Sequence, residues 1–141
     1  MPERRALQLA VCIAGIVPVS AGLLGILTGA GFTGDVLGAA GDSHYRYLSG
    51  LLLGIGLTFW SLVPRIEHAT HPARILTAIV FLGGLARLYA LAVTGWPTWP
   101  MIGGLTMELV VTPTLWLWHG RWLGRWLPHV PSAPMRDQNR P

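Results

Sequence analysis

The chain has 141 residues, of which 52% are hydrophobic and only 11% are Asp, Glu, Lys or Arg. Because about a quarter of the residues in a soluble domain are charged, this composition excludes an ordinary soluble fold and favours a surface covered by lipid. The net charge of +4 is spread over several short segments between apolar runs, which argues against a nucleic-acid interface, where basic residues share one face.

The first predicted element is a membrane-spanning helix over residues 6–28, a stretch that contains no charged side chain and is long enough to cross a bilayer. We expect Pro18 to bend this helix, because proline removes one backbone hydrogen bond. Small residues on one helical face allow another helix to approach closely. The glycines that form such a face here are Gly15, Gly22, Gly25 and Gly29.

Two alternatives apply to this first segment. Arg4 and Arg5 precede an apolar run, and residues 19–21 (Val-Ser-Ala) resemble a signal-peptide cleavage site. The run continues to Leu27, however, which suits a retained span better than a removable leader. Cys12 is the only cysteine, so no intrachain disulfide can form, and we expect a buried apolar side chain there rather than a lipoprotein attachment site.

Three more spans follow in the sequence. A glycine-rich loop over residues 29–43 leads into a span over residues 44–63, in which Gly50 and Gly54 form a second small-residue face. A third span over residues 73–94 and a fourth over residues 101–119 are joined by an uncharged, proline-rich turn. Residues 1–120 are therefore predicted to form one all-α domain, a membrane-embedded four-helix bundle.

The C-terminal segment, residues 121–141, is basic. Trp118, Trp122 and Trp126 fall four residues apart and so share one helical face, beside Arg121 and Arg125. This pattern predicts a short helix that lies in the membrane interface. Beyond Pro128 the chain has little to bury, and we expect disorder there.

The arginines predict the orientation, because basic residues accumulate in cytoplasmic loops. If there are four spans, eight arginines fall on one side of the membrane: Arg4, Arg5, Arg65, Arg74, Arg121, Arg125, Arg136 and Arg140. Both termini of this multi-pass membrane protein are thus expected in the cytoplasm.

Two charges lie well inside predicted spans, Arg87 in the third and Glu108 in the fourth. Each lies eight residues from the turn that joins these spans, or roughly 12 Å below the outer boundary at 1.5 Å per residue. A charge in hydrocarbon needs a partner or a water-filled cavity. We therefore expect Arg87 and Glu108 to pair across two neighbouring antiparallel helices.

Other polar side chains are predicted at a similar height. Arg46 begins the second span, and we expect it to join Arg87 and Glu108 in an outer-half pocket that binds a small lipophilic molecule, with His44, Tyr47 and Tyr89 as further ligand-binding residues. If the protein is an enzyme, Glu108 and Arg87 are the catalytic candidates, for acid–base chemistry such as isomerisation or ring opening. Asp42, His44 and Tyr45 are further acid–base candidates at the pocket mouth.

The alternative is that the Arg87–Glu108 pair only holds two helices in register. No metal site is predicted, because His68 and His71 alone supply too few ligands. No cofactor is predicted either, since the glycine-rich stretch over residues 34–41 lacks the lysine of a phosphate loop.

Three segments together resemble a known family: HYRYLSG at residues 44–50, FLGGLARL at residues 81–88, and ELVVTP at residues 108–113 with Trp118. The chain resembles the bacterial membrane proteins grouped as domain-of-unknown-function family 4345, over roughly residues 7–121. The resemblance implies a four-helix membrane domain and the importance of Arg46, Arg87 and Glu108, but it supplies no reaction. It also leads us to expect a multi-pass protein of the bacterial inner membrane.

Two other functions compete with lipophile binding. The chain is also interpretable as an accessory subunit, or as one copy of a homo-oligomer, that packs through its glycine faces and tryptophan-rich tail. A third hypothesis is a proton-coupled exporter. Four-helix multidrug exporters have a similar size, but their essential carboxylate lies in the first helix, and the first span here has none.

Overall fold

The computed structural model describes residues 2–34, 36–95 and 99–126, and these form helices without any strand. The helices are α1 (Pro2–Thr28), η1 (Gly29–Thr33), α2 (Ala39–Leu62), η2 (Val63–His68), α3 (Thr70–Thr94), α4 (Trp99–Thr106), η3 (Met107–Val111) and α5 (Thr112–Trp126). The elements α4, η3 and α5 follow one another without a break and form the fourth long helix. The predicted all-α fold is confirmed.

Four helical segments are long and apolar enough to cross a membrane: Glu3–Gly31, Ala39–His68, Thr70–Thr94 and Met101–Gly124. Many of their large apolar side chains, such as Leu9, Leu27 and Leu82, are exposed on the outside of the protein. In water such a surface would be unfavourable, whereas in a bilayer lipid tails cover it. The chain is therefore a multi-pass membrane protein in contact with the bilayer.

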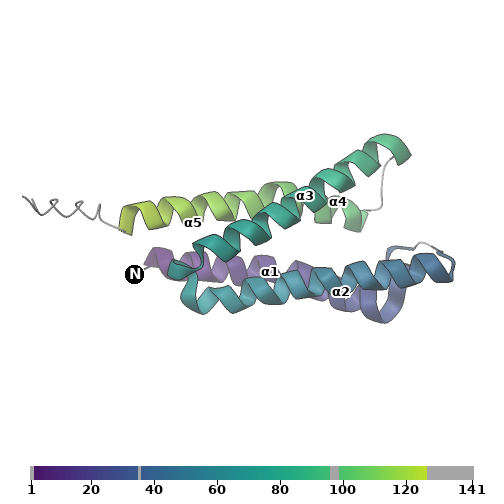
Figure 1. Ribbon diagram of the computed structural model, residues 1–141, viewed down its shortest axis with the longest axis horizontal. Coiled ribbons are helices and arrows are strands. Elements are labelled where there is room, and N and C mark those ends of the chain that lie inside the picture. Colours follow the sequence, from purple (N-terminus) through teal and green to yellow (C-terminus); the bar gives the residue numbers. More distant parts are fainter. Residues whose placement is uncertain (1, 35, 96–98, 127–141) are drawn as a thin grey trace, which may run out of the picture.

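The helices α1 and α2 form one closely packed antiparallel pair (Figure 1). A Cβ atom on Gly22 would lie 2.6 Å from the backbone nitrogen of Leu53, and one on Gly25 would lie 2.2 Å from the Oγ of Ser49. The predicted small-residue face on the first span is thus confirmed, and α2 is the helix that approaches it. Gly50 and Gly54 face none of the described helices, because a Cβ atom on either would have no neighbour within 4 Å.

The helix α3 and the continuous helix α4–η3–α5 form the second pair. Figure 1 shows that α3 begins beside the first pair and ends far from it, so the two pairs converge at one end of the molecule and diverge at the other. The convergent end holds the start of α1 and the end of α5. Its buried apolar cluster consists of Leu7, Ile66, Trp122 and Leu123.

The turn η2 is tied to its neighbours at this convergent end. Arg4 donates to the backbone carbonyl of Pro64 (3.2 Å) and pairs with Glu67 (3.1 Å). Gln8 donates to the carbonyl of Val63 over 2.8 Å, and the Nε2 of His119 lies 2.7 Å from the carbonyl oxygen of Ile66. Side chains from α1 and α5 therefore hold η2 between the two pairs.

The structure differs from the prediction after His119. Helix α5 continues without interruption to Trp126, so no separate interfacial helix begins there. Trp122 is buried against Leu7 and Ile66, whereas Trp118 is partly exposed. Apolar packing against α1 and η2 therefore extends the fourth span. The predicted disordered tail beyond Pro128 lies outside the described residues.

Candidate functional site

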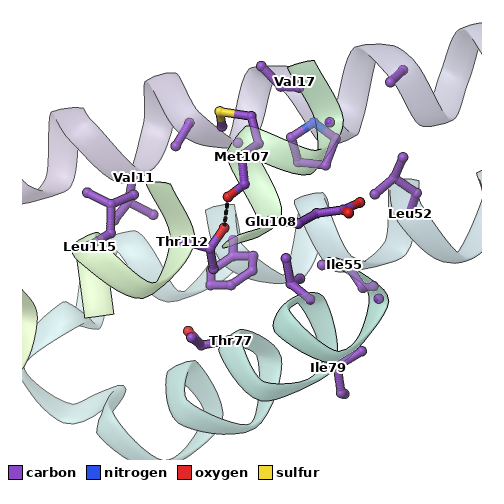
Figure 2. Close-up of a pocket in the computed structure, with 18 of the residues that line it drawn as sticks. Val11, Val17, Leu52, Ile55, Thr77, Ile79, Met107, Glu108, Thr112 and Leu115 are labelled. Atoms are coloured by element: carbon purple, nitrogen blue, oxygen red, sulfur yellow. Dashed lines mark hydrogen bonds between the residues drawn. The ribbon is translucent and has the colours of Figure 1, made fainter. Parts of the chain in front are cut away.

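A cavity of about 1190 Å³ lies between the two helix pairs, and all four long helices contribute to its wall. Figure 2 shows apolar side chains such as Val11, Leu52, Ile79 and Leu115 around it, with Glu108 among them. A mostly apolar wall with few polar groups is typical of a site for a small lipophilic ligand.

Arg87 of α3 and Glu108 of η3 both line this cavity and bind each other. The Nε of Arg87 donates to Oε2 of Glu108 over 3.0 Å, and its Nη2 donates to Oε1 over 3.0 Å. Such a two-pronged arrangement is the strong form of an arginine–carboxylate pair. The predicted pairing of these residues is present, and their depth in a bilayer stays a prediction. The two side chains are 35% and 15% exposed, so the pair is open to the cavity.

Two glycines, Gly84 and Gly104, lie next to the Arg87–Glu108 pair. A Cβ atom on Gly84 would lie 2.7 Å from Cδ2 of Leu109 and 2.9 Å from Cβ of Glu108, so α3 and η3 can touch only because Gly84 has no side chain. The guanidinium of Arg87 lies over Gly104, where an added Cβ atom would be 3.7 Å from Cζ. The close approach of the two helices therefore depends on Gly84, whereas a Cβ atom at Gly104 would make only ordinary van der Waals contact with Arg87.

Glu108 lies in a π-helical turn, Met107–Val111, which the sequence analysis did not predict. Pro113 has no N–H group and would clash with the carbonyl four residues before it in a regular α-helix. The turn widens, and both the N–H and the hydroxyl of Thr112 donate to the carbonyl of Met107, the hydroxyl over 2.9 Å (Figure 2). Such turns are frequent at functional sites.

His119 also lines the cavity, near its convergent end, and the sequence analysis did not select it. It is only 4% exposed. The sequence spacing could have identified His119 as a residue on the same side as Glu108. Intervals of four, four and three residues connect Glu108, Thr112, Trp116 and His119. These intervals place all four on one helical face, and all four line the cavity.

Arg46 does not join Arg87 and Glu108. Its Nε donates to Oδ2 of Asp42 over 2.8 Å, and its Nη1 donates to the backbone carbonyl of Ile26. Arg46 is therefore bound at the end of α1, and it is absent from the cavity wall. The prediction of a three-charge pocket was wrong at this residue because a carboxylate one helical turn away supplies a nearer partner.

The prediction placed three further residues in the pocket, and none of them lines the cavity: Tyr47, Tyr89 and His44. Tyr47 and Tyr89 are 63% and 71% exposed, and His44 is exposed with its ring beside that of Tyr47. The physical reason is helical geometry, since residues two apart point to different sides of a helix. Tyr47 follows the cavity-lining Tyr45 by two positions, and Tyr89 follows Arg87 by two.

Tyr45 is the tyrosine that the structure places on the cavity wall, together with Ser49 one turn further along α2. Among the described residues, no group of three or more His, Cys, Asp and Glu side chains lies close enough together to hold a metal ion.

The family model described as a domain of unknown function, DUF4345, matches residues 6–119. The chain therefore belongs to this family. The match covers the second and third spans, most of the first and fourth, the cavity wall and the Arg87–Glu108 pair. No curated protein and no solved structure matches the chain significantly.

Proposed function

We propose that this member of the family binds a small lipophilic molecule in the cavity between its helix pairs and holds the polar group of that molecule at Arg87 and Glu108. The arginine distribution supports an orientation with both termini in the cytoplasm, and we take the membrane to be the bacterial inner membrane. In that orientation the ion pair lies in the outer half of the bundle and the convergent end faces the cytoplasm.

The observation that carries the proposal is the place of the ion pair, on the wall of a large cavity. A pair that served only to fix the register of two helices would be expected to be closed over by packed side chains, because protein interiors are filled to high density. Here apolar walls from four helices surround a space that the two charged side chains border.

The chemistry of the pair supports a neutral polar ligand group. Arg87 uses its Nε and Nη2 on Glu108, which leaves its Nη1 to donate to a carbonyl or hydroxyl oxygen. A free carboxylate or phosphate would be repelled by Glu108 at the same place. If the bound molecule is transformed, Glu108 is the base for the isomerisation or ring opening that a carboxylate beside an arginine suits.

The substitution Glu108→Gln tests this proposal, and Glu67→Gln is the matched control because Glu67 forms an Arg–Glu pair with Arg4 outside the cavity wall. The proteins are purified in nanodiscs, and the lipophilic molecules that remain bound are extracted and identified by mass spectrometry. We expect a compound that is retained by the natural chain and by Glu67→Gln and is reduced about tenfold or more in Glu108→Gln, since charge-assisted hydrogen bonds contribute roughly 1.5–3 kcal/mol.

Equal retention by all three proteins would contradict the proposed function. Loss of the folded protein in Glu108→Gln, without such a compound in the natural chain, would favour the register role. Thermal unfolding of each purified protein separates these outcomes.

A second candidate function, as an accessory subunit or homo-oligomer, is favoured by one observation. Gly50 and Gly54 on α2 face none of the described helices of this chain, and small residues on lipid-facing surfaces let another helix approach. Replacing both glycines with leucine should then release a stoichiometric partner, or a second copy, from the protein purified in mild detergent. Unchanged composition of the purified complex would argue against this function.

A further inference from the structure

The π-helical turn at Glu108 changes which backbone groups of the fourth long helix are paired. In a regular α-helix the carbonyl of each residue accepts the N–H of the residue four positions later. The N–H of Thr112 donates instead to the carbonyl of Met107, five positions earlier. The carbonyl of Glu108 therefore loses the donor that an α-helix would give it.

Pro113 removes the other helical donor. In a continued π-helical turn the carbonyl of Glu108 would accept the N–H of the residue five positions later, but that residue is a proline and has no N–H group. The hydroxyl of Thr112 donates to Met107 as well, over 2.9 Å. Within the described part of the chain, neither helical position nor this hydroxyl supplies a donor to the carbonyl of Glu108.

This free carbonyl lies on the cavity side of its helix. A helical carbonyl points along the axis toward the residue four positions later, so that of Glu108 lies between the side chains of Glu108 and Thr112. Both residues line the cavity, and Figure 2 shows Glu108 among the apolar side chains of the wall. A backbone oxygen in such surroundings needs a donor, because neither lipid tails nor apolar side chains supply one.

The polar groups beside this carbonyl set what a ligand must offer. The carboxylate of Glu108 only accepts, and the hydroxyl of Thr112 already uses its hydrogen on Met107. Nη1 of Arg87 remains to donate, since the Nε and Nη2 of the guanidinium bind the carboxylate. A fitting group therefore donates to an oxygen and accepts from Arg87. A hydroxyl group does both, whereas a ketone, ester or ether oxygen only accepts, and a protonated amine would be repelled by Arg87.

We infer that the ligand of this cavity is a lipophilic alcohol, whose hydroxyl group donates to the backbone carbonyl of Glu108 and accepts from Nη1 of Arg87. This inference rests on the proposed function and narrows its ligand class to neutral lipophiles that donate a hydrogen bond. The π-helical turn and Pro113 then have a binding role, because together they leave the acceptor free.

Two isomeric probes test the inference, dodecanol and undecyl methyl ether, because both accept hydrogen bonds and only the alcohol donates one. Binding to the full chain in nanodiscs of neutral phospholipid is followed by tryptophan fluorescence, since Trp116 lines the cavity, and by calorimetry. Each probe is expressed as its mole fraction in the lipid. We expect the natural chain to bind the alcohol about tenfold more tightly, the effect of one hydrogen bond to an otherwise unpaired group.

Pro113→Ala supplies the missing N–H group and allows the helix to pair its own carbonyls. The preference for the alcohol should then fall to about twofold or less. Pro72→Ala is the matched control. Pro72 lies in the first turn of α3, where a helix needs no N–H, and outside the cavity wall, so this variant should keep the preference.

A carbon-13 label on the backbone carbonyls of glutamate reads the same contact in the natural chain without any substitution. Dodecanol should move the infrared band of a free labelled carbonyl to lower frequency, and the ether should not. Glu3 and Glu67 carry the label too, but neither lines the cavity. An unchanged band with dodecanol bound would overturn the assignment of this carbonyl, even if Pro113→Ala does not fold.

Equal affinity of the natural chain for the alcohol and the ether would overturn the inference and assign the carbonyl to a water molecule. That result would leave the proposed function standing, provided that binding of both probes falls in Glu108→Gln. A preference that survives in Pro113→Ala would also overturn the inference and place the hydrogen bond on the carboxylate instead. If neither probe binds the natural chain, the inference fails together with lipophile binding at this pair.

Discussion

Gly84 is the residue on which the approach of α3 to η3 depends. Its missing side chain allows Leu109 and Glu108 to lie against the backbone of α3, and the same approach brings the guanidinium of Arg87 onto the carboxylate. The neighbouring Gly83 also lines the cavity, but a Cβ atom on it would have no neighbour within 4 Å. Two adjacent glycines thus have different roles.

We predict that Gly84→Ala destabilises the protein by about 1–3 kcal/mol, the usual cost of inserting a methyl group into a filled contact, and weakens the Arg87–Glu108 pair. Gly83→Ala should be neutral or slightly stabilising, by up to about 1 kcal/mol, because alanine is the better helix former. Thermal unfolding in one detergent measures both. A Gly84→Ala protein as stable as Gly83→Ala would contradict the contact geometry.

Some individual contacts were predictable from the sequence, and others were not. The Arg87–Glu108 contact followed from the equal distance of the two residues from the joining turn. Arg46 was misplaced because its expected depth in the membrane does not tell which carboxylate it binds. Its partner is Asp42, which lies one turn away on the same helix. The hydrogen bond between His119 and the carbonyl of Ile66 could not be predicted, because the two residues are distant in the chain.

At the scale of helices, the α1–α2 pair is held by backbone proximity rather than by large interlocking side chains. We predict that Gly22→Ala separates the pair and lowers the free energy of unfolding by about 1–3 kcal/mol, because the added Cβ atom would lie 2.6 Å from the backbone nitrogen of Leu53. Backbone cannot rotate away as a side chain can. Gly54→Ala is the control on α2, where the added atom has open space. Chemical unfolding followed by tryptophan fluorescence compares the two, and equal stabilities would refute the role of Gly22.

The helix boundaries were largely predictable, because apolar length and glycine and proline positions set them. The π-helical turn at Glu108 was not, although Pro113 was visible as a source of distortion. Proline can be accommodated by a kink or by a wider turn, and tertiary packing decides between them. The unbroken α5 was missed because Trp122 is buried against Leu7 and Ile66, and only the folded chain shows that contact.

For the molecule as a whole, the orientation is open to a direct test. With Cys12→Ala as background, we predict that Gly38→Cys reacts with a membrane-impermeant thiol reagent in intact bacterial cells, because it precedes α2 at the divergent end. His68→Cys, in η2 at the convergent end, should react only after the cells are permeabilised. The opposite pattern would reverse the orientation and place the ion pair in the cytoplasmic leaflet.

The divergence of the two helix pairs has a consequence for how affinity is measured. A molecule that dissolves in lipid and enters between splayed helices comes from the membrane phase and never crosses bulk water. Its occupancy then follows its mole fraction among the lipids, and an aqueous concentration at half-saturation changes with the amount of membrane in the sample. Binding curves measured at several lipid-to-protein ratios should superimpose only when the ligand concentration is expressed as its mole fraction in the lipid.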